Sequence, residues 1–254
     1  MAAVGIPPDP PDPPDPPDVL VTSRPLDEYC ALFGLTRARL AALPGPLLDC
    51  PGGAAGLAAE ARGLGCRVIA VDPAYALPLP VVADAAVAAR AAMAAAMAAR
   101  PQLYPSPRPY RAERYLRSWD RALRLFAADR AAHPQRYVAA ALPRLPFADG
   151  AFALTLSGHL LFAYPELFGP EGQLAALAEL VRVTSPDGEV RVQPLNDGYG
   201  QRCGHLGPLR YALGERRIAS EVRRYPGPVE GRPRRVLVLR AADHRRRAVR
   251  RPVM

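Results

Sequence analysis

A strand, a glycine turn, a helix and a second strand follow one another within residues 47–71, and this pattern constrains the fold most. The apolar run Leu47-Leu48-Asp49 ends at Pro51-Gly52-Gly53, and residues 54–62 have a helical composition. The second run, Val68-Ile69-Ala70-Val71, shows no polar alternation. Such runs are typical of parallel strands covered on both faces, so this segment predicts one βαβ unit with a right-handed crossover.

The rest of the chain alternates apolar runs with helical periodicities. Further strands are predicted at residues 137–141, 152–157, 190–192, 218–225 and 236–239, with turns at 185–188 and 226–228. Helices are predicted at residues 26–33, 36–43, 85–100, 115–133, 174–181 and 205–214, with Thr36 and Asp84 as N-caps. This order predicts a Rossmann-like three-layer α/β/α sandwich, with a seven-stranded, mostly parallel sheet that ends in an antiparallel hairpin.

Residues 76–135 exceed a simple crossover connection and are predicted to form a helical insertion that walls a site. Apolar residues recur along the second half of this insertion at helical spacing, and Trp119 lies on that stripe. We expect Trp119 to be a core residue rather than part of an aromatic substrate box. Two pairs on another face have the i,i+4 spacing of ion pairs: Glu113 with Arg117, and Asp120 with Arg124.

Composition separates a folded domain, residues 19–243, from two polar ends. Residues 1–18 repeat Pro-Pro-Asp and hold little to bury, so we expect a disordered arm. All 33 basic residues are arginine, and residues 200–254 hold 15 of them against 4 acids. We favour a solvated basic tail at residues 244–254, although counterion release would also permit nucleic-acid binding.

The sequence predicts no membrane span and no metal site. No stretch reaches the roughly 20 uninterrupted apolar residues of a span, because Arg90 and Arg100 enclose the most apolar segment. The start of the chain has no export-signal pattern, which predicts a cytoplasmic protein. Buried, reduced thiols are expected at the four cysteines, which form no Cys-x-x-Cys pair: Cys30, Cys50, Cys66 and Cys203.

Candidate ligand-binding residues gather at the carboxyl ends of the predicted strands, where open parallel sheets bind their ligands. They are Asp49, Cys50, Pro51, Gly52 and Gly53 after the first strand, Asp72 and Pro73 after the second, Ala141 and Leu142 after the third, and Ser157, Gly158 and His159 after the fourth. The two glycines allow a ligand to approach the backbone, and amides at the following helix start are expected to point toward it. The Asp72 carboxylate suits a ribose diol.

Three segments resemble successive motifs of class I S-adenosylmethionine-dependent methyltransferases. They are LLDCPGG at residues 47–53, VDP at 71–73 and LPFADGAF at 145–152, and residues 180–190 and the terminal hairpin are also similar to that family. The resemblance covers about residues 45–240, and residues 22–29 and 157–162 are similar to an uncharacterised bacterial subgroup. It implies S-adenosylmethionine as cofactor, with Asp49 and Gly53 beside its methionine part and Asp72 at the ribose. The implied activity is methyl transfer to an unidentified small-molecule acceptor.

Two departures from the family pattern affect the cofactor site. Pro51 replaces the first glycine of the usual loop and Ala55 the last, and a proline supplies no amide donor. The acidic residue that often binds the adenine amine is replaced by Ala141, which leaves the backbone near Leu142 to hold adenine.

His159 is the best-placed candidate general base, because its unperturbed pKa of about 6.5 suits that role. A structural role at a helix start is an equally acceptable interpretation. Tyr164, Gln193 and Asn196, with the neighbouring Asp197, are the candidates to line the acceptor pocket. Tyr29 and Arg24 belong to a lid-like preface that either closes over the cofactor carboxylate or only packs there.

Three other functions stay open. A protein that binds the cofactor without turnover would explain Pro51 and Ala141. A nicotinamide oxidoreductase is disfavoured, because residues 52–56 read GGAAG instead of Gly-x-Gly-x-x-Gly. Methylation or binding of nucleic acid depends on the arginine-rich C-terminal end alone.

Overall fold

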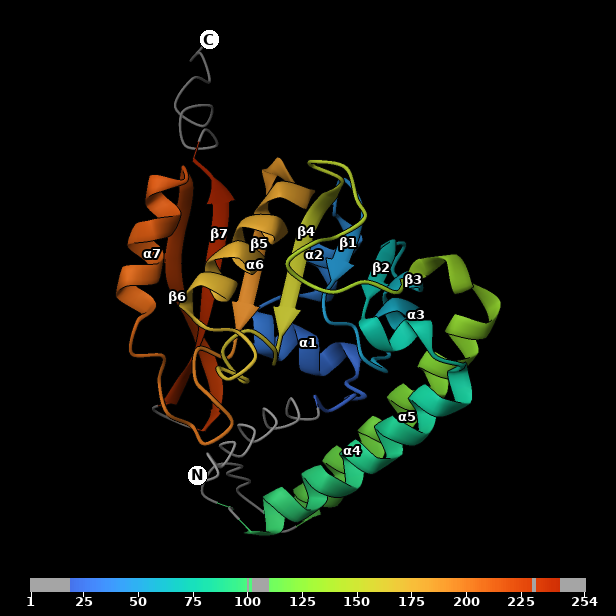
Figure 1. The fold of residues 1–254 in the computed structure, drawn as a ribbon. Coiled ribbons are helices and arrows are strands. Elements are labelled where there is room, and N and C mark those ends of the chain that lie inside the picture. Colours follow the sequence, from blue (N-terminus) through green and yellow to red (C-terminus); the bar gives the residue numbers. More distant parts are fainter. Residues whose placement is uncertain (1–18, 100, 102–109, 230–231, 243–254) are drawn as a thin grey trace, which may run out of the picture.

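The computed structural model describes residues 19–99, 101, 110–229 and 232–242, and its centre is a seven-stranded sheet (Figure 1). The strands are β1 (Leu47–Asp49), β2 (Val68–Val71), β3 (Tyr137–Val138), β4 (Phe152–Gly158), β5 (Thr184–Gln193), β6 (Ile218–Val229) and β7 (Arg232–Ala241). Their order is β3-β2-β1-β4-β5-β7-β6. The strands from β3 to β5 are parallel, whereas β7 is antiparallel to β5 and β6. The predicted sheet with its terminal hairpin is therefore confirmed.

Helices cover both faces of the sheet and complete the predicted three layers. They are α1 (Leu26–Phe33), α2 (Arg37–Ala41), α3 (Leu57–Arg62), α4 (Leu79–Ala99), α5 (Tyr110–Ala132), α6 (Pro170–Val183) and α7 (Leu206–Glu215), with two 3-10 turns, η1 (Pro73–Ala76) and η2 (Pro134–Arg136). Leu47 packs in a buried cluster with α1, α3 and α5, whereas Leu48 packs in a second cluster with α6 and α7. Alternate strand residues face opposite sides, so each cluster is the core beneath one helical layer.

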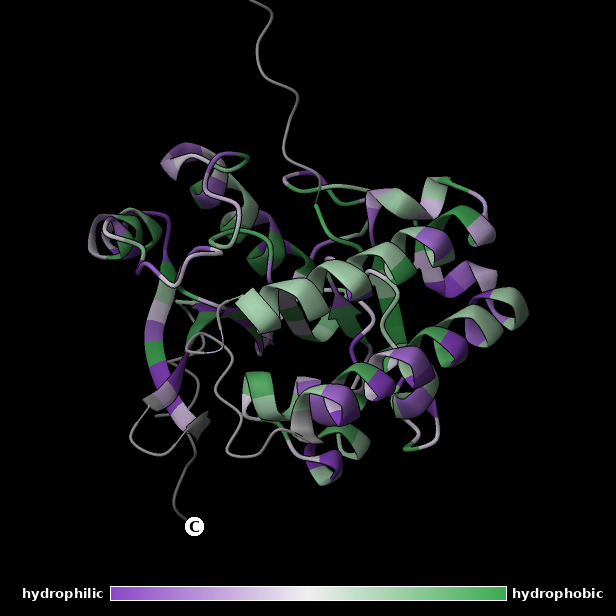
Figure 2. Ribbon diagram, turned by 90° about the horizontal axis from the view of Figure 1, so that it is seen from below, coloured by the Kyte–Doolittle hydropathy of each residue, from purple (hydrophilic) through white to green (hydrophobic). Residues whose placement is uncertain are grey.

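The insertion between β2 and β3 consists of α4 and α5, which pack side by side and project from the sheet (Figures 1 and 2). Arg90 Nη2 in α4 donates to Asp120 Oδ2 in α5 at 3.0 Å, so Asp120 pairs across the helices instead of with Arg124. The predicted pair of Glu113 and Arg117 forms, at 2.8 Å.

Trp119 is fully buried, as expected of a core residue. Its indole nitrogen donates to Glu28 Oε2 at 3.2 Å, and the guanidinium carbon of Arg24 lies 5.1 Å from the ring centroid. Through these contacts α5 holds the start of α1 against the sheet.

By length and composition, α4 is the one helix among the described ranges that could cross a membrane. Core helices of soluble proteins pass the same test, but only 17% of its most apolar window is buried here. Asp84 lies within α4 and does not cap it, so the predicted start at residue 85 is wrong. The helix begins at Leu79 because Pro80 fits the first turn, where a missing N–H costs no hydrogen bond. The cytoplasmic location stays a prediction.

Several other boundaries differ from those expected. The turns predicted at 185–188 and 226–228 lie inside β5 and β6, at shifts in the strand register, so their glycines and prolines form bulges rather than chain reversals. The third strand ends at Val138, because Ala141 forms an isolated bridge beyond it. α3 starts at Leu57 and not at residue 54. The predictions of a disordered arm at residues 1–18 and a basic tail at residues 244–254 concern segments outside the described residues.

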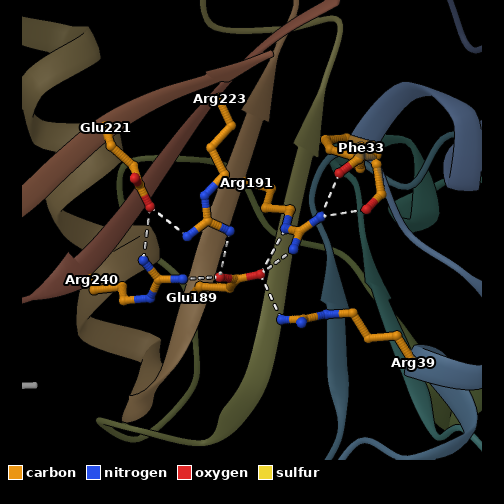
Figure 3. Close-up of polar contacts among 8 residues, drawn as sticks. Phe33, Arg39, Glu189, Arg191, Glu221, Arg223 and Arg240 are labelled. Atoms are coloured by element: carbon orange, nitrogen blue, oxygen red, sulfur yellow. Dashed lines mark hydrogen bonds and ion pairs between the residues drawn. The ribbon is translucent and has the colours of Figure 1, made fainter. Parts of the chain in front are cut away.

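A buried carboxylate, Glu189, joins β5 to both the hairpin and the helical preface (Figure 3). Its Oε1 accepts from Arg191 Nε and from Arg39 Nη2, each at 2.7 Å, and its Oε2 pairs with Arg240. Arg191 in turn donates to the carbonyl oxygen of Phe33, at the end of α1, at 2.5 Å. Burial by itself raises the pKa of Glu189, but the surrounding guanidinium groups outweigh burial and hold that pKa below its usual value.

We expect Glu189→Gln to lower the free energy of unfolding by about 3 to 5 kcal/mol at pH 7, because it leaves the buried Arg191 without its carboxylate partner. The depressed pKa means that the wild-type contribution is present above pH 4.5 and is lost as the pH falls through the folded value. Urea unfolding at pH 7 and pH 4 measures both effects. Glu113→Gln, which removes an exposed pair, is the control and should change stability by less than about 0.5 kcal/mol. Equal losses in the two variants would contradict the role of Glu189.

Candidate functional site

A cavity of about 740 Å³ lies at the carboxyl edge of the parallel strands. Its walls include segments that follow each parallel strand: Cys50–Gly53 after β1, Asp72–Ala74 after β2, Ala140–Pro143 after β3, Gly158–Leu160 at β4, and Gln193 at β5. This volume is within the range of small-molecule sites, roughly 300 to 1,000 Å³. The strand tips therefore converge on one cavity, as the sequence predicted.

Asp72 lines the cavity at the tip of β2 and organises the chain around it. Its Oδ2 accepts from Gly53 N at 2.9 Å, and its Oδ1 accepts from Ala74 N at 3.0 Å. Each carboxylate oxygen retains a second lone pair, so a diol in the cavity still finds two acceptors. Burial raises the pKa of Asp72, and the two backbone donors oppose that rise.

The amides of the glycine loop, residues 52–56, are all bonded within the protein. Gly52 N donates to Val71 O, Gly53 N to Asp72 Oδ2, Ala54 N to Thr22 O, Ala55 N to Gly52 O and Gly56 N to Arg24 O, at distances from 2.8 to 3.2 Å. The amides of residues 54–56, where the sequence predicted the start of the helix, are therefore bonded to the protein, contrary to the expectation that they point toward a ligand. The carbonyl oxygens of Thr22 and Arg24, which accept from Ala54 and Gly56, belong to a segment that precedes β1 in the chain.

Residues 19–24, which we call the N-terminal strap, cross the glycine loop and form one wall of the cavity. Leu20 N donates to the hydroxyl oxygen of Tyr164 at 3.2 Å, which links the strap to the segment after β4. Arg24 is buried at the end of the strap, where its Nε donates to Glu28 Oε1 at 2.9 Å. Arg24 and Tyr29 both line the cavity, as their proposed lid position requires.

Protein neighbours are enough to require glycine at both loop positions. Gly53 has φ +52, and a Cβ there would lie 2.8 Å from Thr22 O in the strap. A Cβ on Gly52 would lie 2.5 Å from the hydroxyl oxygen of Tyr75, which donates to Gly53 O at 2.7 Å. Substitution of either glycine would displace the wall of the cavity.

Asp49 is buried behind the cavity and is not part of its lining. Its Oδ2 accepts from the Tyr29 hydroxyl at 2.9 Å, and its Oδ1 has no partner within the described residues. Burial raises the pKa of Asp49 to about 8; the Tyr29 hydrogen bond lowers it and the charge of Asp72 raises it. The carboxyl group is therefore mostly protonated at neutral pH.

His159 and Gln193 meet at the tips of β4 and β5, and both line the cavity. His159 N donates to Gln193 O at 2.8 Å, and the imidazole Nδ1 lies 3.3 Å from Gln193 Nε2. Burial lowers the pKa of His159 well below its usual value, and the charges of Arg24 and Arg234 lower it further. The imidazole is therefore neutral at pH 7.

The remaining predicted site residues divide between the cavity and its surroundings. Cys50, Pro51, Pro73, Ala141, Leu142 and Tyr164 line the cavity. Ser157 is buried beneath it, with a hydroxyl that has no partner in the described part of the chain. Asn196 lies outside the lining and donates to Asp197 O at 3.0 Å.

The sequence interpretation missed two parts of the wall. One is the first half of the strap, which the sequence marks only by the apolar triplet Val19-Leu20-Val21 after the proline-rich arm, whereas Arg24 at its end belongs to the predicted lid-like preface. The other is an apolar group far apart in sequence: Leu32, Phe33, Met93, Leu167 and Phe168. No motif marks these residues, because only the packing of α1, α4 and the segment after β4 brings them together.

All four cysteines are free thiols, with Cys50 and Cys66 buried and Cys30 and Cys203 half-buried. The described ranges contain no group of three or more His, Cys, Asp or Glu side chains that could hold a metal ion.

We expect Asp49→Asn to stabilise the protein at alkaline pH, because asparagine keeps the acceptor for Tyr29 but cannot ionise. The raised pKa means that the contribution of Asp49 to stability is present below the unfolded pKa of about 4 and is lost as the pH rises through about 8. In scanning calorimetry the variant should match the wild type near pH 5 and melt several degrees higher at pH 8.5. The exposed substitution Asp84→Asn is the control. Parallel profiles for wild type and Asp49→Asn would rule out a titrating Asp49.

No protein-family model and no curated protein sequence matches the chain. Among solved structures it is similar to the Burkholderia thailandensis 1,6-didemethyltoxoflavin-N1-methyltransferase with bound 1,6-didemethyltoxoflavin and S-adenosylhomocysteine, at 20% identity over 82% of this chain and 76% of that chain, with a TM-score of 0.46. It is also similar to the CcbJ methyltransferase from Streptomyces caelestis, at 16% identity, 86% and 91% coverage and a TM-score of 0.45. A third similar structure is the TehB-like SAM-dependent methyltransferase from Corynebacterium glutamicum, at 15% identity, 84% and 93% coverage and a TM-score of 0.41.

Proposed function

We propose that this protein is a class I S-adenosylmethionine-dependent methyltransferase that acts on a small molecule. One observation carries the proposal: a single cavity runs along the tips of the parallel strands, and Asp72 stands in its wall at the tip of β2. The strand order provides the switch point at which such sheets bind nucleoside ligands. The motif resemblance at residues 47–53, 71–73 and 145–152 supports the same cofactor.

The residues present fit the nucleoside part of the cofactor. Asp72 keeps two free lone pairs for a ribose diol, and the adjacent apolar wall from Ala140 to Pro143 suits an adenine ring. The methionine part would lie near the glycine loop and the strap. There Arg24 lines the cavity and offers a guanidinium group to the cofactor carboxylate. The loop amides do not contribute there, because they bond to the protein itself.

When bound, the cofactor would supply a methyl group on a sulfonium, which an in-line nucleophile would take up with the thioether as leaving group. The protein contributes alignment and exclusion of water. The strap closes the cavity over the tips of β1 and β2, and the segment after β4 forms the wall beside β5. Leu160, Tyr164, Leu167 and Phe168 make that second end largely apolar, which suits a small organic acceptor.

A second function is favoured by one feature, the complete internal bonding of the loop amides. Because these amides are not available to a ligand, they cannot position the cofactor for methyl transfer. A protein that only binds the cofactor would not need them for that purpose. Tight binding of S-adenosylhomocysteine without product across an acceptor panel would favour this alternative. Binding of nucleic acid stays a prediction that concerns residues 244–254, outside the described residues.

Asp72→Ala should weaken binding of S-adenosylhomocysteine at least tenfold, because it removes the charge-assisted bonds to the ribose diol, roughly 1.5 to 3 kcal/mol each. Isothermal titration calorimetry measures the dissociation constant. Asp72→Asn, which keeps one acceptor and the bond to Gly53 N, should lose less than the alanine variant. Asp84→Ala, on the exposed side of α4, should bind like the wild type. Unchanged affinity in Asp72→Ala, or no binding by the wild-type protein, would refute the proposed site.

A further inference from the structure

The contact between β4 and β5 fixes both the backbone and the ring of His159. The residue has φ +54, a left-handed conformation that is uncommon outside glycine, although asparagine, aspartate and histidine adopt it more often than other residues. The hydrogen bond from its N–H to Gln193 O, at 2.8 Å, holds that conformation. The side chain of Gln193 then faces the ring, with Nε2 at 3.3 Å from Nδ1. Two residues at adjacent strand tips therefore determine how the imidazole faces the cavity.

This contact selects one tautomer. The amide nitrogen of Gln193 has hydrogens and no acceptor lone pair, so it can only donate, and Nδ1 must accept. A neutral imidazole that accepts at Nδ1 carries its proton on Nε2. The second ring nitrogen of His159 is then a hydrogen-bond donor and cannot take a proton from an acceptor molecule.

The charges that act on His159 are positive. Arg24 approaches from the strap, and Arg234 from β7. Leu237 of β7 pairs with Val192 near the tip of β5, so Arg234, three residues earlier, lies beyond the carboxyl edge of the sheet. Glu28 balances part of this charge through its ion pair with Arg24. Burial and these two arginines disfavour the imidazolium form, which keeps the ring neutral.

We propose that His159 is a neutral hydrogen-bond donor that binds an anionic oxygen of the methyl acceptor, a phenolate or a carboxylate. This inference rests on the proposed methyltransferase function and names its substrate class. It replaces the role of general base expected from the sequence. Asp72 does not supply the missing base, because it lies at the β2 end of the cavity, where its two remaining lone pairs are assigned to the ribose diol.

The transfer balances without a base. A lone pair on the acceptor oxygen forms the new O–C bond to the methyl carbon, the C–S bond of the sulfonium breaks, and its electron pair stays on sulfur. An anion and a cation become two uncharged centres, an ester or aryl ether and a thioether, and no proton is released. A neutral alcohol or ammonium acceptor would have to lose a proton, for which His159 Nε2 offers no lone pair.

The tautomer of His159 can be measured on the free protein by long-range ¹H–¹⁵N NMR of the histidine rings. The chain has four histidines, and the resonance that disappears in His159→Asn identifies this one. A neutral ring protonated at Nε2 from pH 6 to 8 is the expected result. Protonation at Nδ1, or an imidazolium that forms near pH 6.5, would overturn the proposal. Calorimetric binding of S-adenosylhomocysteine in the same sample tests the methyltransferase function separately.

Rates of methyl transfer in two His159 variants distinguish a hydrogen-bond donor from a general base at this position. Asparagine tolerates φ +54 and offers an N–H donor but cannot act as a base, whereas His159→Leu removes both capacities. Formation of S-adenosylhomocysteine would be followed with benzoate and 4-nitrophenolate as anionic probes, and with benzyl alcohol and benzylamine as matched probes that must lose a proton. We expect turnover of an anionic probe, kept within about tenfold in His159→Asn and reduced further in His159→Leu. Preferred turnover of benzylamine or benzyl alcohol, or a loss of 10²- to 10⁴-fold in His159→Asn, would favour a base and refute the proposal.

Discussion

The bidentate contacts of the Asp72 carboxylate are the constraint on which the cavity depends. One oxygen holds the amide of Gly53 and the other caps the 3-10 turn at Ala74, so a single side chain joins the tips of β1 and β2. Tyr75, in that turn, then bonds back to the carbonyl of Gly53. The loop needs glycine because the strap and Tyr75 press against it. A carboxylate that organises the wall is already rigid before any ligand arrives, which reduces the entropy that binding must overcome.

The wall formed by the strap, residues 19–24, depends on a charge network that lies outside the cavity. Glu189 gathers arginines from α2, β5 and the terminal hairpin, and Arg191 extends this network to the end of α1 (Figure 3). α1 follows directly on the strap, so the network sets where residues 19–24 cross the glycine loop. Breaking the network would thus affect both the stability of the sheet and the closure of the cavity.

The two ends of the cavity differ in their electrostatics. The β2 end presents a carboxylate, which suits a diol, whereas the β4–β5 end presents a neutral imidazole beneath two arginine charges. Asp49, the acid expected beside the cofactor, lies behind the wall, and its raised pKa leaves it mostly uncharged at neutral pH. Under the proposed function, the cationic methyl donor would lie with its ribose at the acidic β2 end. The anionic acceptor would lie at the electropositive β4–β5 end.

Sequence patterns alone predicted the three layers, the succession of strands along the chain and the position of Asp72 after the second strand, because unalternated apolar runs and the residues that end them are local features. It also placed His159 and Gln193 at the site, since both follow predicted strands. The remaining features follow from contacts in the folded chain. Local patterns could not show that the carbonyl oxygens of Thr22 and Arg24 accept from the amides of Ala54 and Gly56, that Gln193 Nε2 lies 3.3 Å from His159 Nδ1, or that Asn196 lies outside the cavity lining. Each of these depends on contacts between segments distant in the chain, and such contacts arise only when the strand tips and the strap pack together.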